Sequence, residues 1–236
     1  MGRAFEYRKA AKMKRWGQMS RIFPKLAKAI TIAAKEGGDD PDMNAKLRTA
    51  IQNAKAQNMP KDNITSAIKR ASGKDATNFT EVNYEGKGPH GVLVYVECAT
   101  DNTTRTVANI KYYFNKFGNG QVPSGSLEFL FDRKAVLEFE SKEEIDIEEL
   151  EFELIDAGLE EIDEHDGTVY VYGDYTNFGS LTKAFEEKGI ELTKANLQRI
   201  PTSPVEYTQK QLEEIDIMLD KLEEDDDVQG VFTNIL

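Results

Sequence analysis

Residues 135–199 have the sequence AVLEFESKEEIDIEELEFELIDAGLEEIDEHDGTVYVYGDYTNFGSLTKAFEEKGIELTKANLQR, and this stretch decides the fold class. Short runs rich in β-branched and aromatic residues predict four strands, at 135–140, 159–163, 168–173 and 190–199. Two amphipathic stretches between them predict helices, at 146–157 and 177–188. The resulting order, β-α-β-β-α-β, is typical of a ferredoxin-like domain.

The sequence on the two sides of this stretch forms a second set of helices and strands. Upstream, two β-rich runs joined by a glycine-rich turn predict a hairpin, at 79–85 and 91–99. A helix at 103–117 and a strand at 126–131 follow the hairpin. This upstream set of elements, at 79–131, lacks a second helix and a closing strand. The downstream sequence predicts both, at 208–224 and 228–234.

We therefore expect a discontinuous α+β domain, 76–132 and 204–236, with a ferredoxin-like domain, 133–203, inserted into it. Three sequential domains with a C-terminal extension are the alternative. The N-terminal third, 1–75, predicts three amphipathic helices, at 20–36, 42–58 and 61–72. The expected fold class is thus α+β: an N-terminal three-helix domain plus two ferredoxin-like α+β domains, one inserted into the other.

The net charge of the chain is −12, from 30 Lys and Arg against 42 Asp and Glu among 236 residues. Taken alone, this total argues against a nucleic-acid partner. However, residues 1–75 hold 17 basic and 7 acidic residues, a net of +10, and residues 76–236 hold 13 and 35, a net of −22. Such asymmetry favours a nucleic-acid-binding segment joined to acidic domains. A Lys-rich helical domain with a solvated surface and no ligand is the alternative.

Basic residues of the N-terminal third recur at helical spacing. Four of them would lie within about 80° of one another on a helix, at Arg21, Lys25, Lys28 and Lys35. Such a ridge suits a phosphate backbone, where affinity comes from charge neutralisation and counterion release. No base-reading motif accompanies it. The candidate nucleic-acid-binding residues are Arg8, Lys9, Lys12, Lys14, Arg15, Arg21, Lys25, Lys28, Lys35, Lys69 and Arg70.

Several classes of protein are disfavoured by the composition. No run of about 18 apolar residues is present, and the basic N-terminal segment lacks the apolar core of a secretory signal, so we expect a cytoplasmic protein without a membrane span. Cys98 lies in an apolar run and is expected to be a small buried hydrophobe. The two histidines, His90 and His165, do not support a catalytic triad or a metalloprotease motif. We therefore expect no enzymatic activity, metal, cofactor or small-molecule substrate.

Two further segments match binding motifs only in part. Gly86, Gly88 and Gly91 have the spacing of the dinucleotide-binding fingerprint, but a strand follows where that motif requires a helix. We therefore expect a hairpin turn. Residues 225–227, three consecutive Asp, could attract a cation, but they lack the spaced oxygen ligands of a calcium loop. A solvated helix end is the favoured interpretation.

The polar segment TDNTTRT, residues 100–106, follows a predicted strand and begins a predicted helix. Asp101, Asn102 or Thr103 could cap this helix, and its unpaired N–H groups, with Arg105 nearby, could bind an anion. Capping with a local ion pair, and no ligand, is the alternative. We therefore treat these four residues as a possible anion or partner site.

Several short segments, spread over nearly the whole chain, form a specific combination. They are Gly37-Gly38, Pro41-Asp42, Asn44, Leu47-Arg48, Ile51, Ala54, Asn58-Met59, Ile68-Lys69-Arg70-Ala71, Tyr84-Glu85-Gly86-x-Gly88-Pro89-x-Gly91, Glu97-Cys98-x-Thr100-Asp101-Asn102, Arg105-Thr106-Val107, Gly125-Ser126, Phe131 and Asp225-Asp226-Asp227-Val228-Gln229-x-Val231. In this combination the chain resembles the YebC/PmpR family. Two segments depart from the family pattern. Residues 2–10 lack the usual Gly-His-Ser-Lys-Trp, and residues 118–123 replace its Gly-Gly-Asn-x-Gly loop.

This resemblance implies a cytoplasmic protein with an N-terminal helical domain, two α+β domains and no established catalytic residues. Members are described as probable transcriptional regulators that bind DNA, so we expect a non-enzymatic DNA-binding regulator that acts through its basic N-terminal domain. Other relatives are a mitochondrial translational activator of cytochrome c oxidase subunit I and bacterial proteins tied to the ribosome and to relief of stalling. The alternative is therefore a ribosome-associated translation factor that contacts ribosomal RNA. A protein-interaction scaffold is the third hypothesis.

Overall fold

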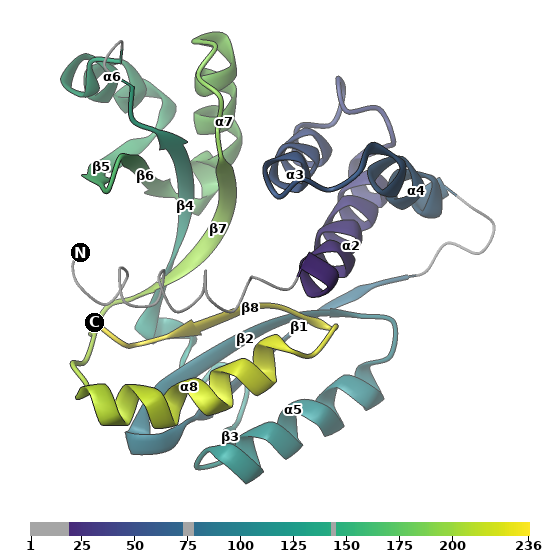
Figure 1. Cartoon of the computed structure of the whole chain (residues 1–236), viewed down its shortest axis with the longest axis vertical. Coiled ribbons are helices and arrows are strands. Elements are labelled where there is room, and N and C mark those ends of the chain that lie inside the picture. Colours follow the sequence, from purple (N-terminus) through teal and green to yellow (C-terminus); the bar gives the residue numbers. More distant parts are fainter. Residues whose placement is uncertain (1–18, 73–77, 143–144) are drawn as a thin grey trace. The chain divides into compact units, whose positions relative to one another are not determined.

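The computed structural model describes residues 19–72, 78–142 and 145–236, without the side chains of residues 19–21. The described residues form the helices and strands labelled in Figure 1. They divide into two compact units. Unit 1 comprises residues 19–28, 78–132 and 200–236. Unit 2 comprises residues 29–72, 133–142 and 145–199.

Three helices follow one another in the N-terminal third, as predicted: α2 (Met19–Gly37), α3 (Ala45–Ala56) and α4 (Lys61–Ser72). Within unit 2 each contributes a fully buried side chain, at Ile30, Leu47 and Ala67. Helix α3 begins three residues later than expected, because the side chain of Asn44 caps it by accepting from the N–H of Leu47 at 3.0 Å. Pro60 precedes α4 and fixes the turn between α3 and α4.

Unit 1 contains a four-stranded sheet in the order β3-β1-β2-β8. Its strands are β1 (Thr80–Lys87), β2 (Leu93–Thr100), β3 (Gln121–Val122) and β8 (Val228–Thr233). Strands β1 and β2 pair antiparallel around the one-turn helix η1 (Pro89–Gly91), which confirms the hairpin. The helices α5 (Thr103–Phe117) and α8 (Gln209–Glu223) pack on one face of the sheet, where Phe114 and Ile215 are fully buried. Thus the last 28 residues complete a sheet that begins at residue 80.

The predicted strand at 126–131 is wrong. The chain instead turns at Gly125 and forms the one-turn helix η2 (Glu128–Leu130), and a strand begins only at Phe131. The buried carboxylate of Glu85 accepts hydrogen bonds from the backbone N–H groups of Gly125 and Leu127, at 2.6 and 2.5 Å. Those N–H groups are therefore satisfied by a side chain and cannot pair with a neighbouring strand.

Unit 2 contains a second four-stranded sheet, in the order β5-β6-β4-β7. Its elements are β4 (Phe131–Glu140), α6 (Ile147–Leu154), η3 (Ile155–Ala157), β5 (Leu159–His165), β6 (Thr168–Asp174), η4 (Tyr175–Asn177), α7 (Phe178–Glu187) and β7 (Lys194–Pro201). Both helices pack on one core with the sheet, in which Leu154, Val171 and Phe185 are fully buried. This order is the predicted β-α-β-β-α-β arrangement.

The last strand of unit 2 begins four residues later than predicted. Gly189 adopts a positive φ of 67° after α7, and the N–H of Ile190 donates back to the carbonyl of Phe185 at 3.1 Å. Ile190 is therefore held against the end of α7, and the chain first bonds to β4 at Thr193, whose N–H donates to the carbonyl of Glu138 at 2.8 Å. The fold class is confirmed: a helical N-terminal region is joined to two antiparallel sheets that carry helices. Among the described residues, no helix has the length and apolar character needed to cross a membrane.

Candidate nucleic-acid interface

The predicted nucleic-acid-binding residues fall into three groups: those outside the described residues, those that are exposed and those that are half-buried. Five of them lie outside the described residues: Arg8, Lys9, Lys12, Lys14 and Arg15. The side chain of Arg21 is also outside them. Three are exposed, at the end of α2 and on α4: Lys35, Lys69 and Arg70. The remaining two, Lys25 and Lys28, are half-buried.

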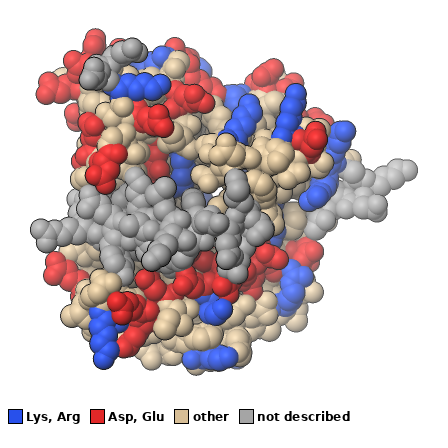
Figure 2. Space-filling model, in the orientation of Figure 1, with Lys and Arg blue, Asp and Glu red and all other residues tan. Residues whose placement is uncertain are grey.

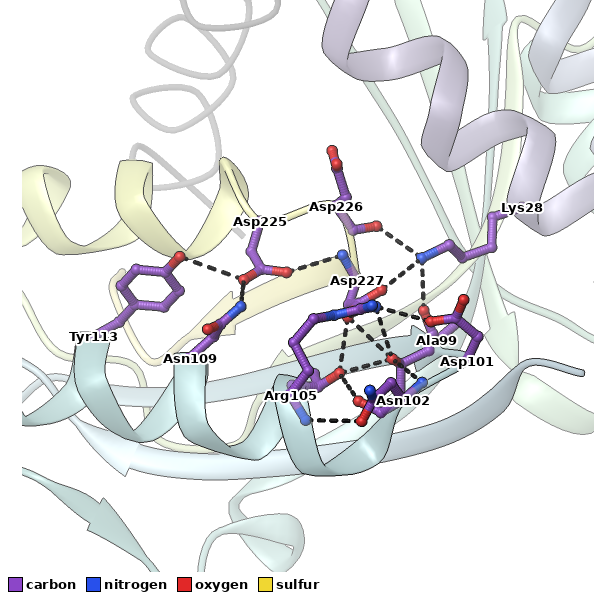
Figure 3. A network of polar contacts seen from close by, with 12 residues as sticks. Lys28, Ala99, Asp101, Asn102, Arg105, Asn109, Tyr113, Asp225, Asp226 and Asp227 are labelled. Carbon is purple, nitrogen blue, oxygen red and sulfur yellow. Dashed lines mark hydrogen bonds and ion pairs between the residues drawn. The ribbon is translucent and has the colours of Figure 1, made fainter. Parts of the chain in front are cut away.

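Lys28 lies on the part of α2 that belongs to unit 1 and points into a polar network (Figure 3). Its Nζ donates to the carbonyl oxygens of Ala99 and Asp226, at 2.8 and 2.9 Å, and to Oδ1 of Asp227 at 3.0 Å. An ammonium group has three N–H donors, and these acceptors use all of them. In this arrangement Lys28 has no donor left for a phosphate.

Lys25, one turn earlier on α2, donates to the carbonyl oxygen of Glu223 at 2.7 Å. Burial lowers the pKa of Lys25, although nearby acidic side chains, Glu223, Asp225 and Asp226, act in the opposite direction. Two of the four residues of the predicted ridge therefore bind acceptors at the end of α8 and in the turn that follows it.

The centre of this network is the carboxylate of Asp227, a residue that is only 3% exposed. Besides Lys28 on Oδ1, its Oδ2 accepts from Thr100 Oγ1 at 3.0 Å, Arg105 Nη2 at 2.7 Å and Thr106 Oγ1 at 2.8 Å. Burial alone would raise the pKa of Asp227, but the hydrogen bonds from Arg105, Lys28 and the two threonines outweigh it and lower the pKa to about 2. The network thus joins α2, the end of β2, the start of α5 and the turn before β8.

Asp225 forms a second buried part of the same turn. Its Oδ2 accepts from Asn109 Nδ2 at 2.9 Å and from the hydroxyl of Tyr113 at 3.3 Å, and its Oδ1 accepts from the N–H of Asp227 at 3.0 Å. The expectation of a solvated helix end at 225–227 is therefore wrong for two of the three carboxylates, because donors from α5 hold them inside. Only Asp226 is exposed. Among the residues that the structure describes, no group of acidic, His and Cys side chains could hold a metal ion.

The segment that precedes α5 forms a cap and an ion pair. The side chain of Asn102 accepts from the N–H of Arg105 at 3.0 Å, and the guanidinium of Arg105 donates to Asp101 at 2.9 Å as well as to Asp227. These hydrogen bonds, above all those with Asp227 and Asp101, raise the pKa of Arg105. Thr103 is exposed in the first turn. The predicted site residues are therefore brought together around carboxylates, and anion binding there stays a prediction.

In the N-terminal part of unit 2, exposed basic side chains lie on α3 and α4 and at the end of α2, and Figure 2 shows several Lys and Arg residues on this surface. Helix α4 buries Ile64 and Ala67 and leaves Lys69 and Arg70 in solvent. Sequence reasoning missed Lys55 and Lys61, which are also exposed and lie on either side of the turn at Pro60. No sequence motif marks these two lysines, and they are identified only by their exposure in the folded structure. Such a surface can bind phosphates by charge but offers no code for reading bases.

Two family models together match nearly the whole chain. One, described as the N-terminal domain of the TACO1/YebC protein, matches residues 3–74, and the other, described as the TACO1/YebC second and third domain, matches residues 79–235. The chain belongs to the TACO1/YebC family. Residues 100–106 and 225–227 of the polar network lie in the part matched by the second model, and Lys28 lies in the part matched by the first.

Relatives match the chain over its full length. A protein of Wolinella succinogenes is 67% identical over 236 residues, and one of Sulfurimonas denitrificans is 63% identical over 235 residues, with 100% of each chain covered in both cases. Both are named probable transcriptional regulatory proteins. The crystal structure of a conserved hypothetical protein from Aquifex aeolicus is 35% identical, with a TM-score of 0.81, over 93% of this chain and 91% of that one. This chain and that solved structure therefore share one fold.

In this TACO1/YebC protein, Asp227 is expected to make stability depend on pH at the acidic end of the range. Its folded-state pKa of about 2 lies below the ordinary value of 3.8, so its contribution is present above about pH 4 and is lost as the pH falls through 2. Because water beside the half-exposed Arg105 screens the network, we expect a contribution of about 1–2 kcal/mol. Urea unfolding of the wild type and of Asp227→Asn, measured between these pH values, checks it: the difference between the two proteins should shrink on acidification, and a constant difference would contradict the assignment.

Proposed function

We propose that this chain is a non-enzymatic, cytoplasmic regulator that binds DNA through a basic N-terminal helical domain, residues 1–75. The proposal includes two further domains, 76–132 with 204–236, and 133–203 inserted between them. The observation that carries it is the charge asymmetry, +10 in residues 1–75 against −22 in the rest of the chain. The names of its relatives, probable transcriptional regulatory proteins, support the regulatory role.

The exposed side chains refine which residues bind phosphate in this proposal. Lys25 and Lys28 donate to acceptors within the molecule, so they contribute little to DNA affinity. Lys69 and Arg70 are exposed at the end of α4, with no ion pair to any described residue. The 35 acidic residues beyond residue 75 repel phosphates and restrict DNA to the N-terminal domain. Sequence preference then depends on DNA shape, since contacts to the backbone carry no base code.

Reversing two charges on α4 is expected to weaken DNA binding and reduce its salt dependence. In Lys69→Glu/Arg70→Glu, two phosphate contacts are lost, so the slope of log K against log salt should fall by about 2 and the affinity at low salt by at least tenfold. Fluorescence anisotropy with a labelled duplex, titrated with salt, measures both quantities. A matched control is Lys111→Glu/Lys210→Glu, which makes the same change in net charge at exposed lysines of α5 and α8 and should leave the slope unchanged.

Equal weakening by both double variants would mean that only the total charge matters, and the N-terminal domain would lose its assigned role. No salt-dependent binding of the wild type at about 50 mM salt would refute DNA binding itself. A structured RNA in the same assay separates the two nucleic acids: tighter binding to RNA, lost in Lys69→Glu/Arg70→Glu, would replace DNA by RNA as the partner of this surface.

A further inference from the structure

One helical face of unit 2 exposes two large apolar side chains. Phe152, on α6, and Ile155, at the start of η3, are 77% and 55% exposed. The core side of this segment is formed by Leu150 and Leu154, which are buried. At 100° per residue, Phe152 lies about 160° from both leucines and about 60° from Ile155. The two exposed side chains therefore form one patch that points away from the core.

This patch is framed by acidic side chains. Glu148, Glu149 and Asp156 lie within about 60° of Phe152 around the helix axis. All three are exposed, and none forms an ion pair with a residue that the structure describes. The helix dipole favours the two glutamates in the first turn but disfavours Asp156, which follows the carboxyl end of α6. Stabilisation of the helix therefore explains the two glutamates beside the patch but does not explain Asp156.

An exposed Phe beside an exposed Ile is unusual on a surface that contacts only water. Single apolar residues are common there, but a contiguous pair with a polar rim is typical of an interface, in which an aromatic side chain supplies much of the binding energy. The side chain of Phe152 has only two rotatable χ angles, so fixing it on binding costs little conformational entropy. The patch therefore has the composition of a docking surface for another molecule.

The charge around the patch selects the chemistry of that molecule. Residues 133–199 hold 7 basic and 19 acidic residues, so this part of the chain repels nucleic acid and anionic lipid surfaces and attracts cations. We propose that the surface formed by Glu148, Glu149, Phe152, Ile155 and Asp156, the Phe152 surface, docks a basic segment of a partner protein in which Lys or Arg residues flank apolar anchors. This interaction is independent of DNA binding by the N-terminal domain.

The test uses the full chain, labelled for NMR, and a synthetic amphipathic peptide of about 20 residues with a Lys face and a Leu face. Amides of α6 and η3 are expected to shift on titration. The variant Phe152→Ser/Ile155→Ser should bind at least tenfold more weakly, because two apolar contacts are lost. The matched control is Ile217→Ser on α8, where an equally exposed apolar residue has only acidic and basic neighbours one turn away. It should bind like the wild type.

Three results would overturn the proposal. A peptide with Ser in place of Leu that binds equally well would show that charge alone is recognised. Unchanged affinity of Phe152→Ser/Ile155→Ser would show that the apolar pair is not the contact. Self-association of the wild type that is lost in this variant, without any effect on the peptide, would make a second copy the occupant. Because both side chains are mostly exposed, the substitutions should leave the unfolding curve unchanged, so loss of binding cannot be attributed to misfolding.

Discussion

Replacing Asp227 by Ala is expected to lower the free energy of unfolding of unit 1 by about 3–5 kcal/mol. The substitution removes the acceptor of four hydrogen bonds and leaves the ammonium of Lys28 half-buried beside two carbonyl oxygens without a counter-charge. It also leaves the buried hydroxyls of Thr100 and Thr106 without their carboxylate partner. Unsatisfied buried donors and unpaired buried charges are among the few changes that cost this much.

Urea unfolding followed by circular dichroism measures the total loss for Asp227→Ala, and hydrogen exchange of the α5 amides reports on unit 1 separately. The neighbouring substitution Asp226→Ala is the matched control. Asp226 contacts Lys28 through its backbone carbonyl, which Ala retains, and its carboxylate is exposed. We expect a change within about 0.5 kcal/mol for the control. Equal losses of unfolding free energy in the two variants would mean that only the removal of a negative charge matters and that the hydrogen bonds of Asp227 do not stabilise unit 1.

The local elements of this fold follow from the sequence because their signals are local. The helix at 103–117 is found at the predicted residues, since Asn102 caps its start and Gly118 ends it. The second sheet follows from periodicity and from turn residues such as Gly158 and Gly167, which adopt positive φ. In each case the physical cause lies within a few residues of the element that it determines.

The contacts that the sequence does not predict are those between residues far apart in the chain. Periodicity places Lys25 and Lys28 on one side of a helix, but it does not identify what that side meets, which is the turn some 200 residues later. The same is true of Glu85. Its carboxylate accepts from the N–H groups of Gly125 and Leu127, so the chain turns where a strand at 126–131 was expected. The burial of Asp225 and Asp227 does not follow from the sequence for the same reason, because a run of Asp indicates solvent exposure unless its hydrogen-bond donors are known.

Substituting Gly86 by Ala is expected to destabilise unit 1 by about 3 kcal/mol, because the site has no room for a methyl group. A Cβ at this position would lie 2.2 Å from Cε1 of Phe114, a ring of α5 that is fully buried. The ring cannot move away without displacing α5 or its packing against α8. Thermal and urea unfolding measure the loss. Gly179→Ala in α7 is the control: no atom lies within 4 Å of its added Cβ, so a helical Ala should stabilise slightly.

The stability of Gly86→Ala also shows whether the first glycine of the Gly-x-Gly-x-x-Gly sequence at 86–91 serves ligand binding or packing. In a dinucleotide site the glycine allows a phosphate to approach the backbone, and replacing it affects the ligand more than the fold. Here the close approach is made by an aromatic ring of the same chain. The loss in Gly86→Ala should therefore be partly recovered in Gly86→Ala/Phe114→Leu, where the smaller side chain leaves room for the methyl group. A double-mutant cycle gives the coupling, expected at 1 kcal/mol or more; additive effects would show that the two residues do not meet.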